Sequence, residues 1–264
     1  MKYNNKIFWV TGASSGIGKA LVYELLNRDA RVIASSNKAD ELKEVKDRCR
    51  EKMHLLSTVV FDLADTGNID RLVAEQFEEH GRIDVLINLG GVSQRARITE
   101  TPLWLDRKIM EINYFGTIAL SKAVLPYMIK QGSGHIMATS SIAGRFGFPL
   151  RSAYSASKQA LHGFFETLHI ENRVNNVKAS VIIPGRVRTN ISVNALTASG
   201  KEHGKMEAGQ ARGISPKKAA RMILRGLDRN KREVLVGGKE LILLFIRKFF
   251  PSIFFNIAYR IKPH

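Results

Sequence analysis

Near its start the chain runs from an apolar stretch directly into a glycine-rich turn: residues 7–18 read IFWVTGASSGIG. Residues 7–10 predict a buried strand, and residues 19–28 carry apolar side chains at helical spacing. Glycines in the turn let the backbone approach a pyrophosphate, which the free N–H groups at the start of a helix bind. We therefore predict a dinucleotide site at Gly12, Ser14, Ser15, Gly16, Ile17 and Gly18.

The same turn contains a second pattern, G-x-S-x-G over residues 12–16, which marks the nucleophile of some hydrolases, here Ser14. That chemistry needs an oxyanion donor from an earlier strand, and no strand precedes residue 7. It would also leave the third glycine without a role. The dinucleotide site is the better interpretation.

Short apolar runs alternate with longer periodic segments along the rest of the chain. We expect further strands at 31–34, 55–61, 85–87, 135–138, 177–183 and 233–236, and helices at 39–52, 69–77, 104–130, 153–174 and 216–229. This alternation predicts an α/β fold: a doubly wound parallel sheet of the Rossmann type, in a single domain over residues 1–238. The polar segment 189–213 breaks the pattern, and we expect a mobile loop that shapes a substrate pocket.

The composition is that of a globular protein except for its charge. Forty-one Lys and Arg residues against 24 Asp and Glu residues give a formal net charge of +17. Residues 201–264 hold 15 of the basic and 5 of the acidic residues, so more than half of the excess lies there. The excess indicates an anionic partner. No basic helix is interleaved with aromatic residues, so we expect no nucleic acid to bind.

Cysteine and histidine usage limits the class of protein further. A single cysteine, Cys49, excludes an internal disulfide and is consistent with a reducing compartment. The seven histidines are scattered without zinc spacing, so we expect no metal. The N-terminal apolar run is too short for a secretory signal, and no 18 uninterrupted apolar residues occur. We expect a cytoplasmic protein.

With the turn at 11–18 and the Tyr-x-x-x-Lys pattern of Tyr154 and Lys158, the sequence resembles the short-chain dehydrogenase/reductase family from about residue 6 to residue 236. Leu89 departs from the family's usual Asn-Asn-Ala-Gly. The loops at 92–95 and 190–196 look like the branch that contains 11-beta-hydroxysteroid dehydrogenase type 1 and membrane-associated reductases. The resemblance implies a homodimer or homotetramer and catalytic residues Asn113, Ser141, Tyr154 and Lys158. It implies cofactor contacts at Asp62, Leu63, Asn88, Leu89, Gly90, Tyr154, Lys158, Pro184, Gly185, Val187 and Thr189.

The chemistry of these catalytic residue types is consistent with that implication. Tyr154 and Lys158 are four residues apart on a predicted helix and share one face. A close ammonium and a cationic nicotinamide favour the phenolate, and lowering the tyrosine pKa from near 10 to about 7 takes roughly 4 kcal/mol. The site should therefore be partly buried. Tyr154 would be the general acid or base, and Ser141 would hydrogen-bond the substrate oxygen. Lys158 would also bind ribose hydroxyls, and Asn113 would anchor a water.

The end of the second predicted strand bears on the choice of cofactor. Dinucleotide folds that prefer NAD place an acidic residue there, on the ribose 2′-hydroxyl. Here residues 34–38 read ASSNK, without a carboxylate to repel a 2′-phosphate. Ser36, Asn37 and Lys38 offer groups that would bind it, although the usual arginine is missing. We therefore predict NADP(H) over NAD(H).

The C-terminal residues 239–264 form a basic, apolar arm. Residues 241–246 read LILLFI, and Pro251 should divide any helix in two. Such a segment suits either an anionic membrane surface or acidic partner, or packing against protein. Both alternatives stay open.

The sequence thus predicts an oxidoreductase that transfers a hydride between NADP(H) and a lipophilic carbonyl or secondary alcohol. One alternative is a reductase of 3-oxoacyl thioesters on an acidic carrier protein, which a charge of +17 would also attract. A second is a non-catalytic module that senses dinucleotides or binds nucleic acid.

Overall fold

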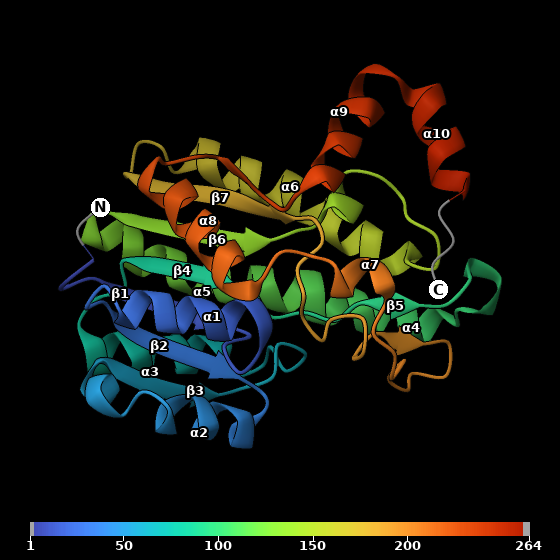
Figure 1. Cartoon of the computed structure of the whole chain (residues 1–264). Coiled ribbons are helices and arrows are strands. Elements are labelled where there is room, and N and C mark those ends of the chain that lie inside the picture. Colours follow the sequence, from blue (N-terminus) through green and yellow to red (C-terminus); the bar gives the residue numbers. More distant parts are fainter. Residues whose placement is uncertain (1–2, 261–264) are drawn as a thin grey trace.

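The first apolar run forms strand β1 (Ile7–Thr11), which is buried at all five positions. This is typical of a parallel strand covered on both faces. In the computed structural model, which describes residues 3–260, β1 lies within a seven-stranded sheet of order β3-β2-β1-β4-β6-β7-β9, and every pairing is parallel (Figure 1). The other strands are β2 (Arg31–Ser36), β3 (Leu56–Val60), β4 (Val85–Asn88), β6 (Gly134–Thr139), β7 (Val177–Pro184) and β9 (Glu233–Val236).

Helices cover both faces of this sheet, each over its own apolar cluster (Figure 1). One face carries α1 (Gly16–Leu26), α2 (Ala39–Asp47) and α8 (Pro216–Asp228). The other carries α3 (Ile69–His80), α5 (Gly116–Gln131) and α6 (Ser152–Glu171). The predicted doubly wound, single-domain fold is confirmed. Its strand order reverses between β1 and β4, and ligands bind at the carboxyl ends of strands at such a point.

Two predicted helices are shorter than expected. The helix expected over 39–52 ends at Asp47, and a 3₁₀ segment (Arg50–Leu55) follows. There Lys52 has non-helical angles, and its Nζ donates to the carbonyl of Leu26 at 2.9 Å, which returns the chain toward α1. The helix expected over 104–130 is divided into α4 (Leu103–Met110), a π-helical turn (Glu111–Phe115) and α5.

The segment 189–213 has more regular structure than the sequence predicts. It contains the short strand β8 (Leu196–Thr197), which pairs in parallel with β5 (Gln94–Arg95), and one turn of helix, α7 (Ala208–Ala211). Hydrophobic periodicity cannot detect elements of two and four residues. We call residues 189–213 the substrate loop from here on, after the role that the sequence predicts for them.

The C-terminal arm folds as two helices, as its proline predicts. After a 3₁₀ turn (Lys239–Leu241), α9 (Ile242–Phe249) and α10 (Pro251–Arg260) form a hairpin that projects from the body (Figure 1). Phe254 is 1% exposed and packs on Phe146, with ring centroids 4.6 Å apart. Within residues 3–260 no helix is long and apolar enough to cross a membrane. Residues 261–264 of the predicted arm, and residues 1–2, lie outside the described residues.

Candidate active site

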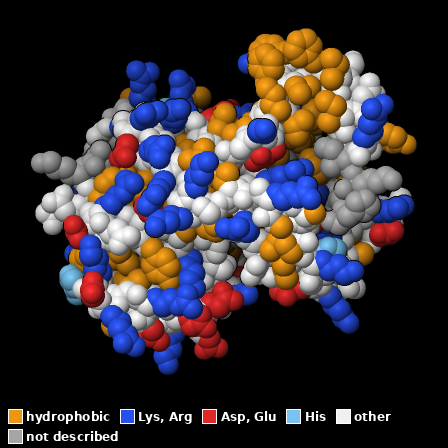
Figure 2. All heavy atoms as spheres, viewed as in Figure 1, with side chains coloured by type: hydrophobic (Ala, Val, Ile, Leu, Met, Phe, Trp, Pro, Cys, Tyr) orange, Lys and Arg blue, Asp and Glu red, His pale blue; other side chains and the backbone are white. Residues whose placement is uncertain are grey.

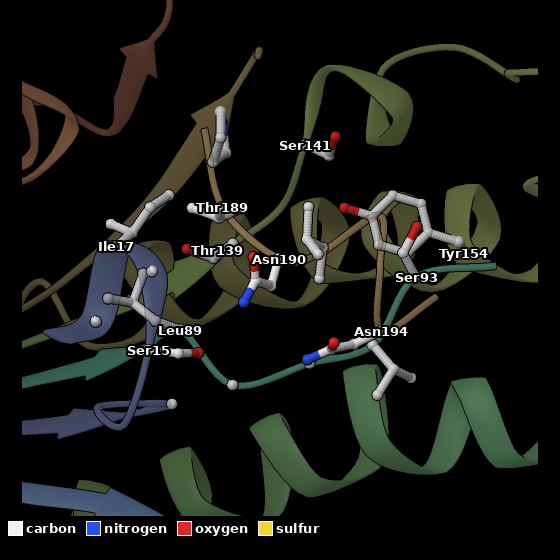
Figure 3. Close-up of a pocket in the computed structure, with 18 of the residues that line it drawn as sticks. Ser15, Ile17, Leu89, Ser93, Thr139, Ser141, Tyr154, Thr189, Asn190 and Asn194 are labelled. Carbon is white, nitrogen blue, oxygen red and sulfur yellow. The ribbon is translucent and has the colours of Figure 1, made fainter. Parts of the chain in front are cut away.

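A cavity of about 650 Å³ opens at the carboxyl ends of the strands, where the fold predicts a ligand. Figure 3 shows Ser15 and Ile17 on one side of it and Tyr154 and Ser93 on the other. The predicted site residues that line it are Gly12, Ser14, Ser15, Gly16, Ile17, Gly18, Ser36, Asn37, Lys38, Asp62, Leu63, Leu89, Gly90, Ser141, Tyr154, Lys158, Pro184, Gly185 and Thr189.

Three predicted residues lie behind the cavity wall. Asn88 is buried, and its amide donates to Ser121 Oγ at 3.2 Å and to the carbonyl of Met137 at 3.3 Å. Val187 is 2% exposed and belongs to the apolar cluster under α1 and α8. Asn113 is fully buried in the π-helical turn. Their side chains support the wall.

The glycine turn has the shape that a pyrophosphate requires. Gly12 and Gly16 have φ values of +63° and +54°, which other residues rarely adopt. A Cβ atom on Gly18 would lie 2.1 Å from the carbonyl oxygen of Gly12, so no larger residue fits there. Helix α1 begins at Gly16 without a side-chain cap from Ser15, so its first N–H groups face the cavity. This cradle fits a dinucleotide phosphate.

Lys158 is the buried cation of the site. Its side chain is 3% exposed, and Nζ donates to the carbonyl of Thr139 at 2.9 Å. Burial lowers the pKa of Lys158 to about 8, because the low-dielectric interior disfavours the ammonium form. Gly91 lies between Lys158 and Asn113: a Cβ on it would be 3.2 Å from Nζ and 2.8 Å from Asn113 Oδ1.

Asn113 holds the strand-end loop beside Lys158. Its Oδ1 accepts from the Val92 N–H at 2.8 Å, and Nδ2 donates to the Val92 carbonyl at 2.9 Å and to Ser157 Oγ at 3.0 Å. Such π-helical turns occur frequently at functional sites, and here the turn brings the asparagine to this loop.

Tyr154 is half-buried, and part of its surface lines the cavity. Burial raises its pKa, while a hydrogen bond with Ser141 and the charges of Arg151 and Arg95 lower it. The sequence predicts that Lys158 and a bound cationic nicotinamide favour the phenolate, and the burial seen here acts in the opposite direction.

Gln94 fixes the position of Tyr154, a role of Gln94 that the sequence did not predict. Its fully buried Oε1 accepts from the backbone N–H groups of Ala153 and Tyr154 at 2.9 and 3.3 Å. Its Nε2 donates to Thr101 and Ser152. The residue before α6, Arg151, provides no side-chain cap, so Gln94 satisfies N–H groups at the helix start. The resemblance of residues 92–95 to one branch of the family does not indicate that Gln94 caps this helix.

Cavity residues Arg95, Arg151 and Glu207 were also missed. They form ion pairs across 56 and 112 residues of sequence, and no local pattern predicts such contacts.

The expected 2′-phosphate end of the cavity is polar and carries no carboxylate on the strand itself. Ser36 Oγ donates to Ser14 Oγ at 3.1 Å, and Lys38 Nζ lies 3.0 Å from Glu41 in an exposed ion pair. Asn37 donates to Asp62 at 3.2 Å. Exposed pairs are weak, so Lys38 is free to turn toward a stronger anion.

Comparison with known proteins agrees with this geometry. A family model described as short chain dehydrogenase matches residues 6–199. This chain belongs to the short-chain dehydrogenase family. A curated relative, mouse dehydrogenase/reductase SDR family member 7B, is 39% identical over 258 residues, which cover 96% of this chain and 80% of the relative. Members of this family are oxidoreductases, and that coarse activity is the one the comparison assigns.

Solved structures of short-chain dehydrogenases share the fold. One from Burkholderia cenocepacia, in complex with NADP, is 25% identical with a TM-score of 0.80 and covers 98% of this chain and 99% of its own. One from Burkholderia phymatum, in complex with NAD, has a TM-score of 0.84 at 21% identity, covers 100% and 98%, and shows the fold alone. These two proteins are thus bound to different nicotinamide cofactors.

Proposed function

We propose that this short-chain dehydrogenase reduces a lipophilic carbonyl compound to a secondary alcohol with NADPH. The observation that supports it most is that one cavity holds both the glycine cradle and the side chains of Ser141, Tyr154 and Lys158. A non-catalytic dinucleotide sensor would not need an acid, a buried cation and a hydroxyl at one end of that cavity.

The residues of the chain divide the work of reduction. When bound, a nicotinamide dinucleotide supplies the hydride. Tyr154 donates its phenolic proton to the substrate oxygen, and Ser141 hydrogen-bonds the same oxygen. Lys158, one helical turn from Tyr154, stabilises the phenolate that remains. A tyrosine hydroxyl carries its proton at neutral pH, so Tyr154 can act as the proton donor that reduction requires.

The substrate end of the cavity has a mixed lining. Val92, Ile112, Phe148, Ile191 and Leu196 provide apolar surface there, which favours a lipophilic substrate. A turnover screen with NADPH should compare steroids, medium-chain ketones and 3-oxoacyl thioesters on a carrier protein. Turnover of apolar ketones or steroids supports the proposal, whereas turnover confined to carrier-bound thioesters would establish the alternative substrate class.

Replacement of Ser36 by aspartate should reverse the cofactor preference. The new carboxylate would repel a 2′-phosphate and accept a hydrogen bond from a free 2′-hydroxyl. We expect kcat/KM with NADPH to fall at least about tenfold, and the value with NADH to hold or rise, because like charges in close contact cost more than about 1.4 kcal/mol. Steady-state kinetics with both cofactors measure this, and Ser57→Asp, on a neighbouring strand outside the cavity, is the control. Equal wild-type efficiency with NADH and NADPH would contradict the preference.

We further propose that the C-terminal arm docks on an anionic lipid surface. Hydrophobic side chains gather over α9 and α10 (Figure 2). Two cations lie against aromatic rings of the arm: Arg247 is 5.2 Å from the ring centroid of Phe255, and Lys248 is 5.2 Å from that of Phe249. Aromatic residues flanked by cations suit a headgroup region, and monomers rarely expose such patches. The apolar residues of the hairpin of α9 and α10 that are at least half exposed are Ile242, Phe245, Phe249, Phe250, Ile253, Phe255 and Tyr259.

Contacts within the protein connect this arm to the cavity. Phe254 packs on Phe146, and the Phe146 ring lies 6.2 Å from that of Phe148, which lines the cavity. A membrane that receives the arm would therefore lie near the substrate end. This placement is consistent with a lipophilic substrate that enters from the lipid.

Flotation with vesicles tests the docking proposal. The triple variant Phe249→Ser, Phe250→Ser, Phe255→Ser keeps buried Phe254, so the fold should persist while vesicle binding falls at least about tenfold, given roughly 1.5–3 kcal/mol per buried aromatic side chain. The control, Ile170→Ser with Val174→Ser, removes apolar residues that are 73% and 90% exposed elsewhere. Vesicles with phosphatidylserine should bind better than phosphatidylcholine alone. Equal flotation of all proteins, or a dimer that only the triple variant loses, would show that protein covers the arm.

A further inference from the structure

Two arginines and one glutamate form a buried cluster at the substrate end of the cavity. Arg95 lies on β5, Arg151 directly precedes α6, and Glu207 directly precedes α7 in the substrate loop. Arg95 Nε donates to Glu207 Oε1 at 2.6 Å, and Arg151 donates to both carboxylate oxygens at 2.8 Å. Their side chains are only 5, 11 and 14% exposed, so this is an interior ion network.

The carboxylate of Glu207 keeps the two arginine charges of the cluster from repelling each other. Burial and the charge of Arg95 lower the pKa of Arg151 to about 10, and the carboxylate of Glu207 opposes that effect. Without Glu207, two like charges would face each other in a poorly solvated place. Removing one partner of a buried ion pair is strongly unfavourable for this reason.

The cluster joins three segments that lie far apart in the sequence. Arg95 belongs to a two-residue strand whose single ladder partner is β8 of the substrate loop. Arg151 lies one turn before Tyr154 on the same helix end that Gln94 caps. Glu207 lies in a loop segment with few regular elements, where Gly200 and Gly204 both have positive φ. Backbone hydrogen bonds connect this loop to Ser93 and the residue after it to Arg186, and the Glu207 side chain adds contacts with Arg95 and Arg151.

We propose that Glu207 is a positioning residue that holds the substrate loop over the cavity by bridging Arg95 and Arg151. The bridge fixes the loop-side wall of the substrate pocket next to Tyr154. Its kinetic consequences rest on the proposed function, but the position of the loop does not. Two convergent guanidinium groups would also suit an acidic group of a substrate, which would then displace Glu207. That is a different assignment, and the tests below separate the two.

Limited trypsin digestion reads the position of the loop without any substrate. The loop contains Lys201, Lys205 and Arg212 as cleavage sites. Glu207→Gln should be cleaved there at least about tenfold faster than the wild type, and Glu207→Asp, which keeps the charge, should lie between them. The control is Glu202→Gln, which removes the same charge from an exposed position of the same loop. Cleavage of Glu207→Gln at the wild-type rate, in a protein that retains its thermal transition, would overturn the proposal.

A double-mutant cycle tests the bridge itself. If Glu207 acts through Arg151, adding Arg151→Met to Glu207→Gln should not accelerate cleavage further, because the interaction is already lost. Additive effects would contradict a bridge.

Kinetics with the substrate found in the screen give a third readout. Loss of the loop wall should raise KM at least about tenfold and change kcat less than threefold for Glu207→Gln, with partial rescue in Glu207→Asp. A lower KM for acidic substrates in Glu207→Gln would instead assign the arginines to substrate binding and overturn the positioning role. If no tested compound turns over, the proposed reaction fails while the digestion result still decides the role of Glu207.

Discussion

Tyr154→Phe is expected to lower kcat for carbonyl reduction by about 10³-fold, within the range that general acid catalysis contributes. The substitution removes the hydroxyl and leaves the ring, so the cavity keeps its shape. Cofactor affinity should change little, because the glycine cradle on the opposite side is untouched. Stopped-flow reduction and NADPH fluorescence titration measure the two effects separately. Full activity in this variant would remove Tyr154 from the chemistry.

The pH dependence of the wild type should have the matching sign. Since burial raises the pKa of Tyr154 above its usual value near 10, the proton donor is present throughout neutral pH. Reduction should therefore not require acid, while oxidation of the alcohol, which needs the phenolate, should accelerate as pH rises. A suitable control is Tyr127→Phe, since this partly exposed tyrosine stacks on Phe77 away from the cavity. Its pH profiles should match those of the wild type.

Local patterns predicted much of the molecule because the relevant physics is local. A strand such as β1 is apolar throughout, and the turn after it needs glycine at Gly12 and Gly18 for reasons of backbone angle and space. Parallel strands then bring distant residues to one edge, so Ser141 and Tyr154 reach the cavity that the turn begins. The predicted positions of most site residues follow from topology.

Contacts between residues far apart in the sequence could not be predicted, because the spacing of residue types along the chain does not indicate them. Arg95 and Glu207 are 112 residues apart and meet only after the substrate loop folds over the cavity. For Tyr154, the sequence shows the neighbouring lysine, whereas the charges of Arg95 and Arg151, which also lower the tyrosine pKa, reach it only in the folded chain. In the π-helical turn, Asn113 contacts Val92 through two hydrogen bonds that hydrophobic periodicity does not predict.

Because Lys158 is buried, its replacement by methionine is expected to lower activity and to raise stability. Lys158→Met should lower kcat by about 10²- to 10³-fold, because the charge that stabilises the developing phenolate is lost. The same variant should be more stable below pH 8. The pKa of Lys158 falls from 10.5 to about 8 on folding, which corresponds to about 3 kcal/mol of unfavourable burial. The variant also loses the hydrogen bond to Thr139, which costs about 1 kcal/mol of stability. We therefore expect its free energy of unfolding to exceed that of the wild type by about 2 kcal/mol.

The pH dependence of that gain distinguishes a charge effect from better packing. Below about pH 8 the lysine is charged in both folded and unfolded chains, and the wild type carries the full cost of burial. Between about pH 8 and 10.5 the folded chain loses the proton while the unfolded chain keeps it, so wild-type stability rises with pH. The advantage of Lys158→Met in urea unfolding should therefore shrink over this interval. Lys130→Met, at an exposed position of α5, should show no such change. A variant less stable than the wild type at every pH would mean that Lys158 serves the fold as well as the reaction.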